Sequence, residues 1–159
     1  PDSDFIYFPG GYPESYLKEL SSNKEMLTSI KEFAQNGGQI YAECGGMMYL
    51  GKAIISENNE AFEMVNYFDF ESTIADKKLH LGYRTSKINN HIFKGHEFHY
   101  SSLINNRETT LNATITNARG GNTTTEIYKK QHVMASYVHH YFGTSEILLQ
   151  LIKKINNNV

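Results

Sequence analysis

The alternation of hydrophobic and polar residues in the first part of the chain predicts strands and helices in turn. The apolar run from Asp4 to Phe8 predicts a strand that ends at the glycine turn "PGGYP". "ESYLKEL" predicts a short helix, and "SNKE", from Ser22 to Glu25, matches a capping box that opens a second helix. Gly37-Gly38 ends this helix. Its apolar positions share one face: Leu27, Ile30, Phe33 and Ala34.

The following segment repeats this order of elements. "QIYAE" predicts a strand, Cys44-Gly45-Gly46 a turn, and "MMYLGKAI" a helix. Strand, helix, strand and helix in succession are typical of an α/β fold with a parallel sheet. We therefore expect a mostly parallel sheet that is flanked by helices.

The middle of the chain, from Phe68 to Ile127, is rich in Thr, Tyr, Phe and His, with frequent Asn and Gly. This composition predicts several strands separated by turns: "FESTIA", "LGYRTSKI", "GHEFHYSSLI", "NATITNAR" and "TTEIYKK". The run "HVMASYVHHYF" predicts a further strand, which ends at Gly143. "TSEILLQLIKKI" predicts an amphipathic helix capped by Thr144 or Ser145, with a frayed tail at Asn156–Asn158.

Composition narrows the class of protein. A chain of 159 residues is long enough for one domain with a buried core. The formal net charge of -2 does not favour nucleic acid or an anionic membrane as a partner, because both attract basic surfaces. No apolar run approaches the ~18–20 residues that span a bilayer. A single cysteine cannot form an internal disulfide, so we expect a cytoplasmic protein.

The only cysteine lies where a strand turns into a helix. A strand, a nucleophile, two glycines and a helix form a nucleophile elbow, in which the nucleophile has a strained backbone and its small neighbours allow close packing. The start of a helix also favours the thiolate form of Cys44. The backbone N–H of Gly45 could stabilise an oxyanion there. A buried, inert cysteine in a glycine-rich turn is the alternative interpretation.

A thiol nucleophile needs a base, which is most often histidine. Neighbouring side chains on a strand point to opposite faces, so His139 and His140 cannot both face Cys44. The diglycine Gly10-Gly11 follows the first strand, at the edge of the sheet where α/β proteins bind ligands. Its N–H groups could complete an oxyanion hole, although a plain turn fits the same residues.

Five motifs in this order carry a family resemblance: "PGGYPE", "YAECGGMMYL", "LGYR", "GHEFHYS" and "ASYVHHYF". The chain resembles the class I glutamine amidotransferase domain of cobyrinic acid a,c-diamide synthases, from Phe8 to Phe142. The resemblance implies the flavodoxin-like fold of class I amidotransferases. It also makes residues 1–159 a C-terminal glutaminase domain that lacks its first strand and helix.

The resemblance assigns roles to individual residues. Cys44 corresponds to the glutaminase nucleophile, and His139 corresponds to the base, the first histidine of the family's "SYxHxHF". Tyr141 replaces the second histidine of that motif, so the site resembles a Cys–His dyad. Glu97 and His99 are our candidates for an orienting or substrate-side role, and Glu97 is the candidate to orient the imidazole, because it shares a strand face with His99. The resemblance implies no metal site.

The resemblance also implies the reaction. The domain hydrolyses glutamine and supplies ammonia to an N-terminal synthetase domain of the same polypeptide, where Mg-ATP activates the a and c carboxylates of a cobyrinate-type tetrapyrrole. No GxxxxGK[ST] pattern occurs in this chain, so we expect it to contain only the ammonia-producing part and to need no cofactor of its own. A homodimer is compatible with this interpretation.

Three alternatives stay open on the sequence alone. The same glutaminase would serve a nickel-sirohydrochlorin a,c-diamide synthase. A cysteine hydrolase or a stress-response protein of the flavodoxin-like group would need a base soon after the cysteine, and no histidine lies between Cys44 and His80. A non-catalytic interaction module would keep the fold without the chemistry.

Overall fold

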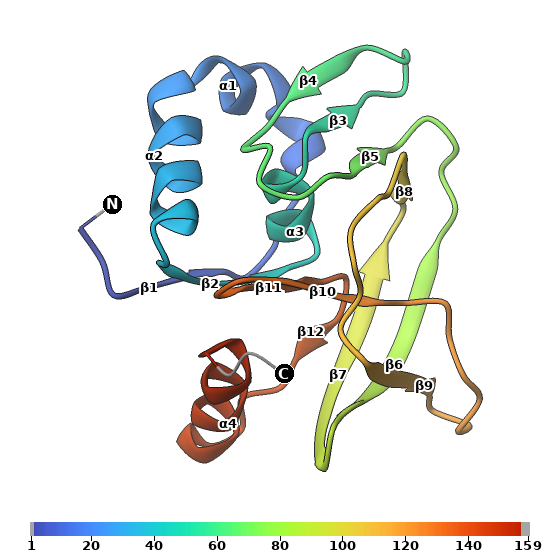
Figure 1. The fold of residues 1–159 in the computed structure, drawn as a ribbon. Coiled ribbons are helices and arrows are strands. Elements are labelled where there is room, and N and C mark those ends of the chain that lie inside the picture. The colour runs from blue at the N-terminus through green and yellow to red at the C-terminus, as the bar shows by residue number, and fades with distance from the viewer. Residues whose placement is uncertain (1, 157–159) are drawn as a thin grey trace.

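A computed structural model describes residues 2–156, which form three four-stranded sheets and several helices (Figure 1). The central sheet has the strand order β1-β2-β11-β10. In this sheet β1, β2 and β11 pair in parallel and β10 is antiparallel to β11. The bounds of these strands are Phe5–Phe8 for β1, Gln39–Glu43 for β2, Ile127–Lys130 for β10 and Val133–Ser136 for β11.

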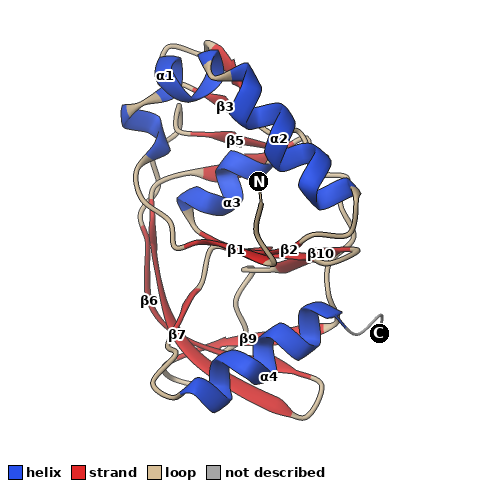
Figure 2. Cartoon of the chain, turned by 90° about the vertical axis from the view of Figure 1, so that its left-hand side faces the viewer, coloured by secondary structure: helices blue, strands red, loops and turns tan. Residues whose placement is uncertain are grey.

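Helices cover both faces of the central sheet. Figure 2 shows α1, α2 and α3 on one side of the sheet and α4 on the other. The pleat of β2 separates two hydrophobic cores accordingly, because Ile40 and Ala42 face the first group of helices and Tyr41 faces α4. The helices are η1 (Pro13–Ser15), α1 (Leu17–Ser22), α2 (Lys24–Gln35), α3 (Gly45–Leu50) and α4 (Ser145–Asn156).

The second helix begins one residue later than the capping-box pattern predicts. Asn23 is its N-cap, and the Asn23 side chain accepts a hydrogen bond from the backbone N–H of Met26 at 3.2 Å. Ser22, the predicted cap, is the last residue of α1. Asparagine caps helices as well as serine does. Ser22 can therefore belong to α1 while Asn23 caps α2.

The other two sheets are largely antiparallel. One has the order β12-β7-β6-β9, and the other has the order β4-β3-β5-β8, in which only β3 and β5 are parallel. Their bounds are β3 Ala53–Ile55, β4 Ala61–Glu63, β5 Glu71–Thr73, β6 His80–Ile88, β7 His91–His99, β8 Ser102–Ile104, β9 Ala113–Asn117 and β12 His139–His140.

The α/β class is thus confirmed, whereas a mostly parallel arrangement holds for the central sheet alone. Short connections account for the difference, because a tight turn can join only antiparallel neighbours. Ile88 pairs with His91 across the β6–β7 turn, and Asn89 in that turn has a left-handed φ of 52°.

Three predicted elements are divided in the structure. The predicted strand "GHEFHYSSLI" becomes the end of β7, at His99, and β8 of another sheet. The helix after Cys44 ends at Leu50, and Ala53–Ile55 form strand β3. Gly51 is extended there, and a Cβ at this position would meet the ring of Phe70 at 2.7 Å, so only glycine permits this approach.

The predicted strand "HVMASYVHHYF" is also two strands. It divides after Ser136, whose hydroxyl accepts a hydrogen bond from the Val138 N–H at 3.2 Å. The chain then leaves the central sheet, and β12 joins β7 in the second sheet.

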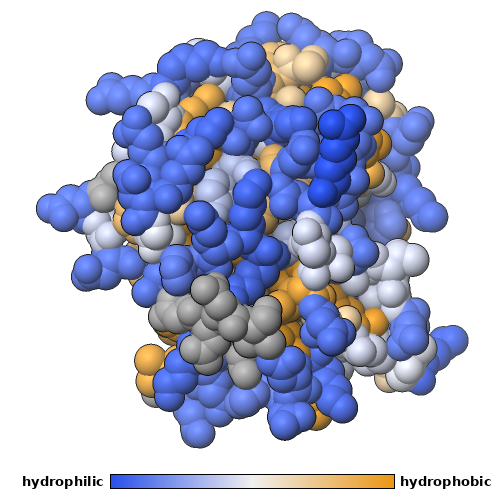
Figure 3. All heavy atoms as spheres, in the orientation of Figure 1, coloured by the Kyte–Doolittle hydropathy of each residue, from blue (hydrophilic) through white to orange (hydrophobic). Residues whose placement is uncertain are grey.

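The visible surface in Figure 3 is mainly hydrophilic, with apolar side chains showing between the polar ones. Within residues 2–156, no helix combines the length and the apolar character that a bilayer crossing requires. Asn156, which the sequence places in a frayed tail, is the last residue of α4, and Asn157 and Asn158 of that tail lie outside the described residues.

Candidate active site

Cys44 lies at a sharp turn between β2 and α3, as the sequence predicts. Its backbone has φ 48° and ψ -111°, a region that non-glycine residues rarely occupy. The Cys44 N–H donates to the Ser136 carbonyl at 2.8 Å, and the Cys44 carbonyl accepts from Met48 N–H at 3.1 Å. These two bonds fix the strained residue between the sheet and the helix, where Cys44 is 7% exposed.

The two glycines after Cys44 are required by the chain segment that follows β1. A Cβ at Gly46 would lie 2.5 Å from the Cβ of Phe8, and a Cβ at Gly45 would meet the Gly11 carbonyl. A Cβ at Gly10 would lie 2.8 Å from Cε1 of His139, and Gly10 also has a φ of 106°. Glycine is therefore dictated here by close approach and by the left-handed backbone.

A cavity of about 410 Å³ opens above Cys44. A volume of this size suits a small-molecule substrate. Four of the residues that the sequence singles out line it: Gly11, Cys44, His99 and His139. Gly10 and Gly45 border an adjacent hollow of about 360 Å³, which Gly11 also lines.

His139 shares this cavity with Cys44. Its Nδ1 lies 3.4 Å from Oε2 of Glu43, and the Cys44 thiol in the same cavity donates to the Phe98 carbonyl at 3.7 Å. Cys44 and Glu43 raise the pKa of His139 to about 10, although burial opposes the shift. The His139 ring stacks on His96 of β7, with the ring centroids 4.9 Å apart. The imidazole is therefore protonated at neutral pH, which suits an ion pair with a thiolate.

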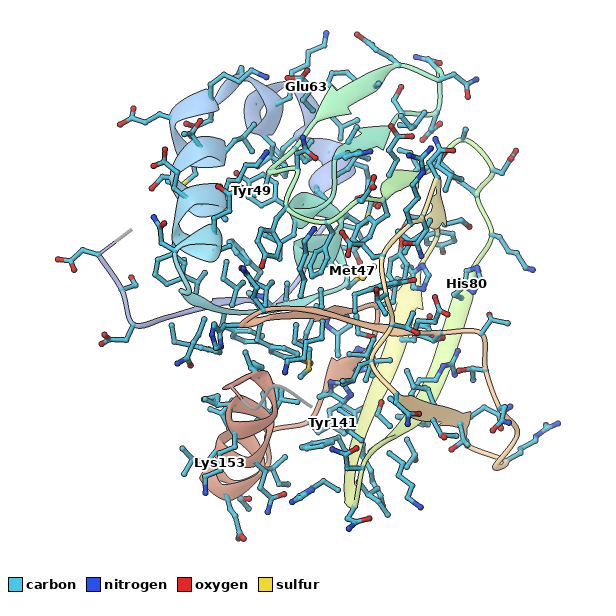
Figure 4. The ribbon with its side chains drawn as sticks, in the orientation of Figure 1. Met47, Tyr49, Glu63, His80, Tyr141 and Lys153 are labelled. Carbon is cyan, nitrogen blue, oxygen red and sulfur yellow. The ribbon has the colours of Figure 1, made fainter. Side chains whose placement is uncertain are left out.

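His140 points to the opposite face of β12, into the core. Its Nδ1 is 2.5 Å from the Tyr41 hydroxyl and its Nε2 is 2.9 Å from the Ser86 hydroxyl. Burial lowers the pKa of His140 to about 4, so this ring is neutral at pH 7. The structure thus brings His139, and not His140, to Cys44. Figure 4 shows Tyr141, the residue that stands in the family's second histidine position, directly after β12.

Glu97 does not orient His139, which corrects the prediction from the strand pattern. Its carboxylate accepts hydrogen bonds from Arg84 Nε at 2.6 Å, His99 Nε2 at 2.7 Å and the Thr125 hydroxyl at 2.9 Å. The reason is the pleat of β7: Glu97 and His99 share one face, and His139 stacks on His96, which faces the other way. Burial raises the pKa of Glu97, but these three hydrogen bonds outweigh it and lower the value to about 2.

Glu43 occupies the position beside His139 that was predicted for Glu97. It is the last residue of β2, directly before Cys44, and is 2% exposed. Sequence reasoning missed it, although one signal was present. A carboxylate inside a strand that is otherwise buried is unusual and marks a candidate functional group.

Three side chains, one of them that of His99, lie close enough together to hold a metal ion. Ligand atoms of His80, Glu97 and His99 lie within 4.8 Å of one another, and His80 is at the start of β6 (Figure 4). The Glu97 carboxylate is already hydrogen bonded to both His99 and Arg84. Arg84 therefore places a permanent cation against the Glu97 carboxylate in this cluster.

Comparison with known proteins gives a consistent result. The sequence model of the protein family described as the CobB/CobQ-like glutamine amidotransferase domain matches residues 1–147. Cobyrinate a,c-diamide synthase of Listeria monocytogenes serovar 1/2a is 37% identical over 89% of the chain and 33% of its own length. The same-named protein of Methanocaldococcus jannaschii is 37% identical over 92% of the chain and 34% of its own length. Hydrogenobyrinate a,c-diamide synthase of Rhizobium meliloti is 29% identical over 87% of the chain and 34% of its own length.

The chain therefore spans about a third of the length of the curated relatives that it matches. Solved structures agree on the fold. A crystal structure of a glutamine amidotransferase aligns with a TM-score of 0.61 at 14% identity, covering 96% of this chain and 78% of the other. A second crystal structure, described as a GMP synthase component of Thermoplasma acidophilum, aligns with a TM-score of 0.53 at 14% identity, covering 97% and 73%.

Proposed function

The chain belongs to the CobB/CobQ-like glutamine amidotransferase family, and we propose that it is the glutaminase part of an a,c-diamide synthase of cobalamin biosynthesis. The observation that carries this proposal is the Cys44–His139 pair in a strained elbow at the floor of a substrate-sized cavity. The acceptor is proposed from the relatives, which are named for cobyrinate or hydrogenobyrinate.

The first half-reaction forms a thioester. The Cys44 thiolate attacks the side-chain amide carbon of glutamine, and the carbonyl oxygen becomes an oxyanion. The His139 imidazolium gives its proton to the leaving nitrogen, the C–N bond breaks, and ammonia leaves. The raised pKa of His139 supports this role, because the ring carries the proton before the reaction starts.

Backbone N–H groups of Gly10, Gly11 and Gly45 are proposed to hold the oxyanion. Gly45 opens α3, where the first N–H groups have no partner inside the helix. The Gly11 carbonyl lies against Gly45, so the two segments meet beside Cys44. A donor of this kind contributes on the order of 10²–10³ in rate.

The second half-reaction returns the enzyme to its starting state. Neutral His139 takes a proton from water, the hydroxide attacks the thioester carbon, and the C–S bond breaks. Glutamate leaves and Cys44 is again a thiolate beside an imidazolium. His99 borders the cavity, and Glu97 fixes its ring, so we assign both to the substrate side of the site.

The ammonia is consumed elsewhere. We propose that it passes to a synthetase domain, where Mg-ATP activates the a and c carboxylates of the tetrapyrrole acceptor. The length of the relatives supports this division, since the chain matches only about a third of each of them.

Ammonia release from glutamine tests the proposal directly. The full-length protein should release ammonia and glutamate in equal amounts, and Cys44→Ala should release neither. Hydrolysis that continues in the Cys44→Ala variant would overturn the assignment, and no release by the folded, full-length protein would favour a non-catalytic interaction module.

A further inference from the structure

The carboxylate of Glu43 is buried and held from three sides. Its Oε2 accepts a hydrogen bond from the Tyr7 hydroxyl at 2.7 Å. Its Oε1 accepts from the Tyr41 hydroxyl at 2.9 Å and from the His140 backbone N–H at 2.8 Å. All three donors are neutral, so they fix the position of the carboxylate without cancelling its charge.

Among the side chains that the structure describes, His139 is the one ion-pair partner of Glu43, at 3.4 Å from Oε2 to Nδ1. Nδ1 is thus the ring nitrogen on the Glu43 side, and Nε2 is the nitrogen left for Cys44. The same carboxylate therefore binds the ring of His139 and, through the N–H of the next residue, the strand that carries it.

We propose that Glu43 is the third member of the catalytic set, a positioning residue that holds His139 in register with Cys44 and stabilises its imidazolium form. This inference rests on the proposed function. In enzymes with a nucleophile and a histidine, a buried carboxylate on the distal ring nitrogen fixes the tautomer and stabilises the charged ring. Glu43 does so from the residue directly before the nucleophile, so strain at the elbow and the position of the base are coupled.

The groups around His139 support this assignment. Cys44 faces it from the elbow, Glu43 from β2 and His96 from β7, and His140 is its neighbour on β12. Burial and the charge of His139 lower the pKa of His96, and burial lowers that of His140, so neither ring adds a positive charge beside His139 at neutral pH. Cys44 and Glu43 are the groups that raise the pKa of His139.

The test compares Glu43→Gln with Glu97→Gln in the full-length protein. Glutamine keeps the size of the side chain at both positions and removes the charge. The titration of His139 is followed by NMR of its ring signals, which are identified by their loss in a His139→Gln variant. Glu43→Gln should lower the titration midpoint of His139 by about one unit or more, because an opposite charge at this distance has been removed. Glu97→Gln should leave that midpoint unchanged.

Glutaminase kinetics give the second readout. Glu43→Gln should lower kcat at least about tenfold with little change in KM, and should move the alkaline limb of the pH–rate profile downward. Glu43→Asp keeps the charge on a shorter side chain and should restore part of both the midpoint and kcat. If Glu43→Gln does not fold, Glu43→Asp still tests the inference, because the longer distance to His139 should lower the midpoint and kcat below the wild-type values.

An unchanged titration midpoint of His139 in a folded Glu43→Gln variant would overturn the inference, whether or not Glu97→Gln also leaves the midpoint unchanged. A lowered midpoint in a protein whose wild type does not hydrolyse glutamine would contradict the proposed function and leave the Glu43–His139 interaction intact. The two failures are thereby separated.

Discussion

Two histidines that line the Cys44 cavity, His99 and His139, each lie beside a buried carboxylate, Glu97 and Glu43 respectively. The two carboxylates differ in the charge of the other groups that contact them. Glu97 is bonded to Arg84, His99 and Thr125, whereas Glu43 is bonded to two tyrosine hydroxyls and one peptide N–H. Arg84 neutralises Glu97, but nothing except His139 neutralises Glu43 within the described part of the chain. Glu97 therefore has a permanent cation beside it, whereas the charge of Glu43 is left to act on His139.

The adjacent histidines on β12 show the same contrast over a shorter distance. His139 lies in the cavity with Cys44 and Glu43, and its pKa is raised to about 10. His140 lies in the core against Tyr41 and Ser86, and its pKa is lowered to about 4. One step along a strand therefore changes an imidazole from a cation in the site to a neutral packing group.

Removal of the nucleophile should have the largest effect. Cys44→Ala should lower glutamine-dependent amidation by the full-length protein by on the order of 10⁴-fold or more. Amidation with free ammonia should continue, because ammonia bypasses the first half-reaction. Both activities are measured in parallel, with circular dichroism to check the fold. Loss of both in a folded protein would mean that Cys44 is structural.

The next largest effect should separate the two histidines. His139→Ala should reduce glutaminase activity by roughly 10²–10⁴-fold, because the leaving group loses its acid and the water loses its base. His140→Ala should instead lower the free energy of unfolding by about 1–3 kcal/mol, since Tyr41 and Ser86 lose a buried partner. Initial rates and urea unfolding measure the two effects. Equal loss of activity in two folded variants would remove the distinction between the faces of β12.

Removal of the Glu97 charge should change the free energy of unfolding. Glu97→Gln should lower the free energy of unfolding by about 3 kcal/mol, because Arg84 is left as an unpaired charge with its side chain only 11% exposed. Urea unfolding at neutral pH measures it. A double variant, Glu97→Gln with Arg84→Met, should recover part of the loss, and a loss that stays the same would argue against this ion pair as the cause.

The smallest effect concerns pH. His139 must be protonated to release ammonia, so glutaminase activity should be retained below pH 10 and fall about tenfold per unit as the pH rises above its pKa of about 10. The folded pKa is raised, so the stability that His139 contributes is complete below about pH 6.5 and is lost as the pH rises toward 10. Rates between pH 7 and 11 measure the limb, and a limb near pH 7 would mean that His139 is not held by Glu43 and Cys44.

Local sequence patterns predicted the elbow and most of the elements. Cys44-Gly45-Gly46 after a short apolar run defines the strand–turn–helix, because the steric demand for glycine is expressed in neighbouring residues. The period of apolar residues likewise predicted α4 (Ser145–Asn156). Both features depend on contacts that are close in sequence.

Long-range pairing set the limits of prediction. Glu43 contacts His139 only because the chain leaves the central sheet after Ser136 and β12 pairs with β7. No local sequence pattern predicts this change of sheet. The same applies to Glu97, whose partner Arg84 lies across the β6–β7 hairpin. Alternation along β7 did show which residues share a face, but not which elements pack against each face.

Trapping of the thioester tests the central claim most directly. The full-length protein is mixed with glutamine, quenched in acid and digested, and the peptide that contains Cys44 is examined by mass spectrometry. We predict a mass increase of one glutamyl group on Cys44, which is absent in His139→Ala and reduced in Glu43→Gln. Ammonia release without a glutamyl group on Cys44, or with the group on another residue, would contradict the account.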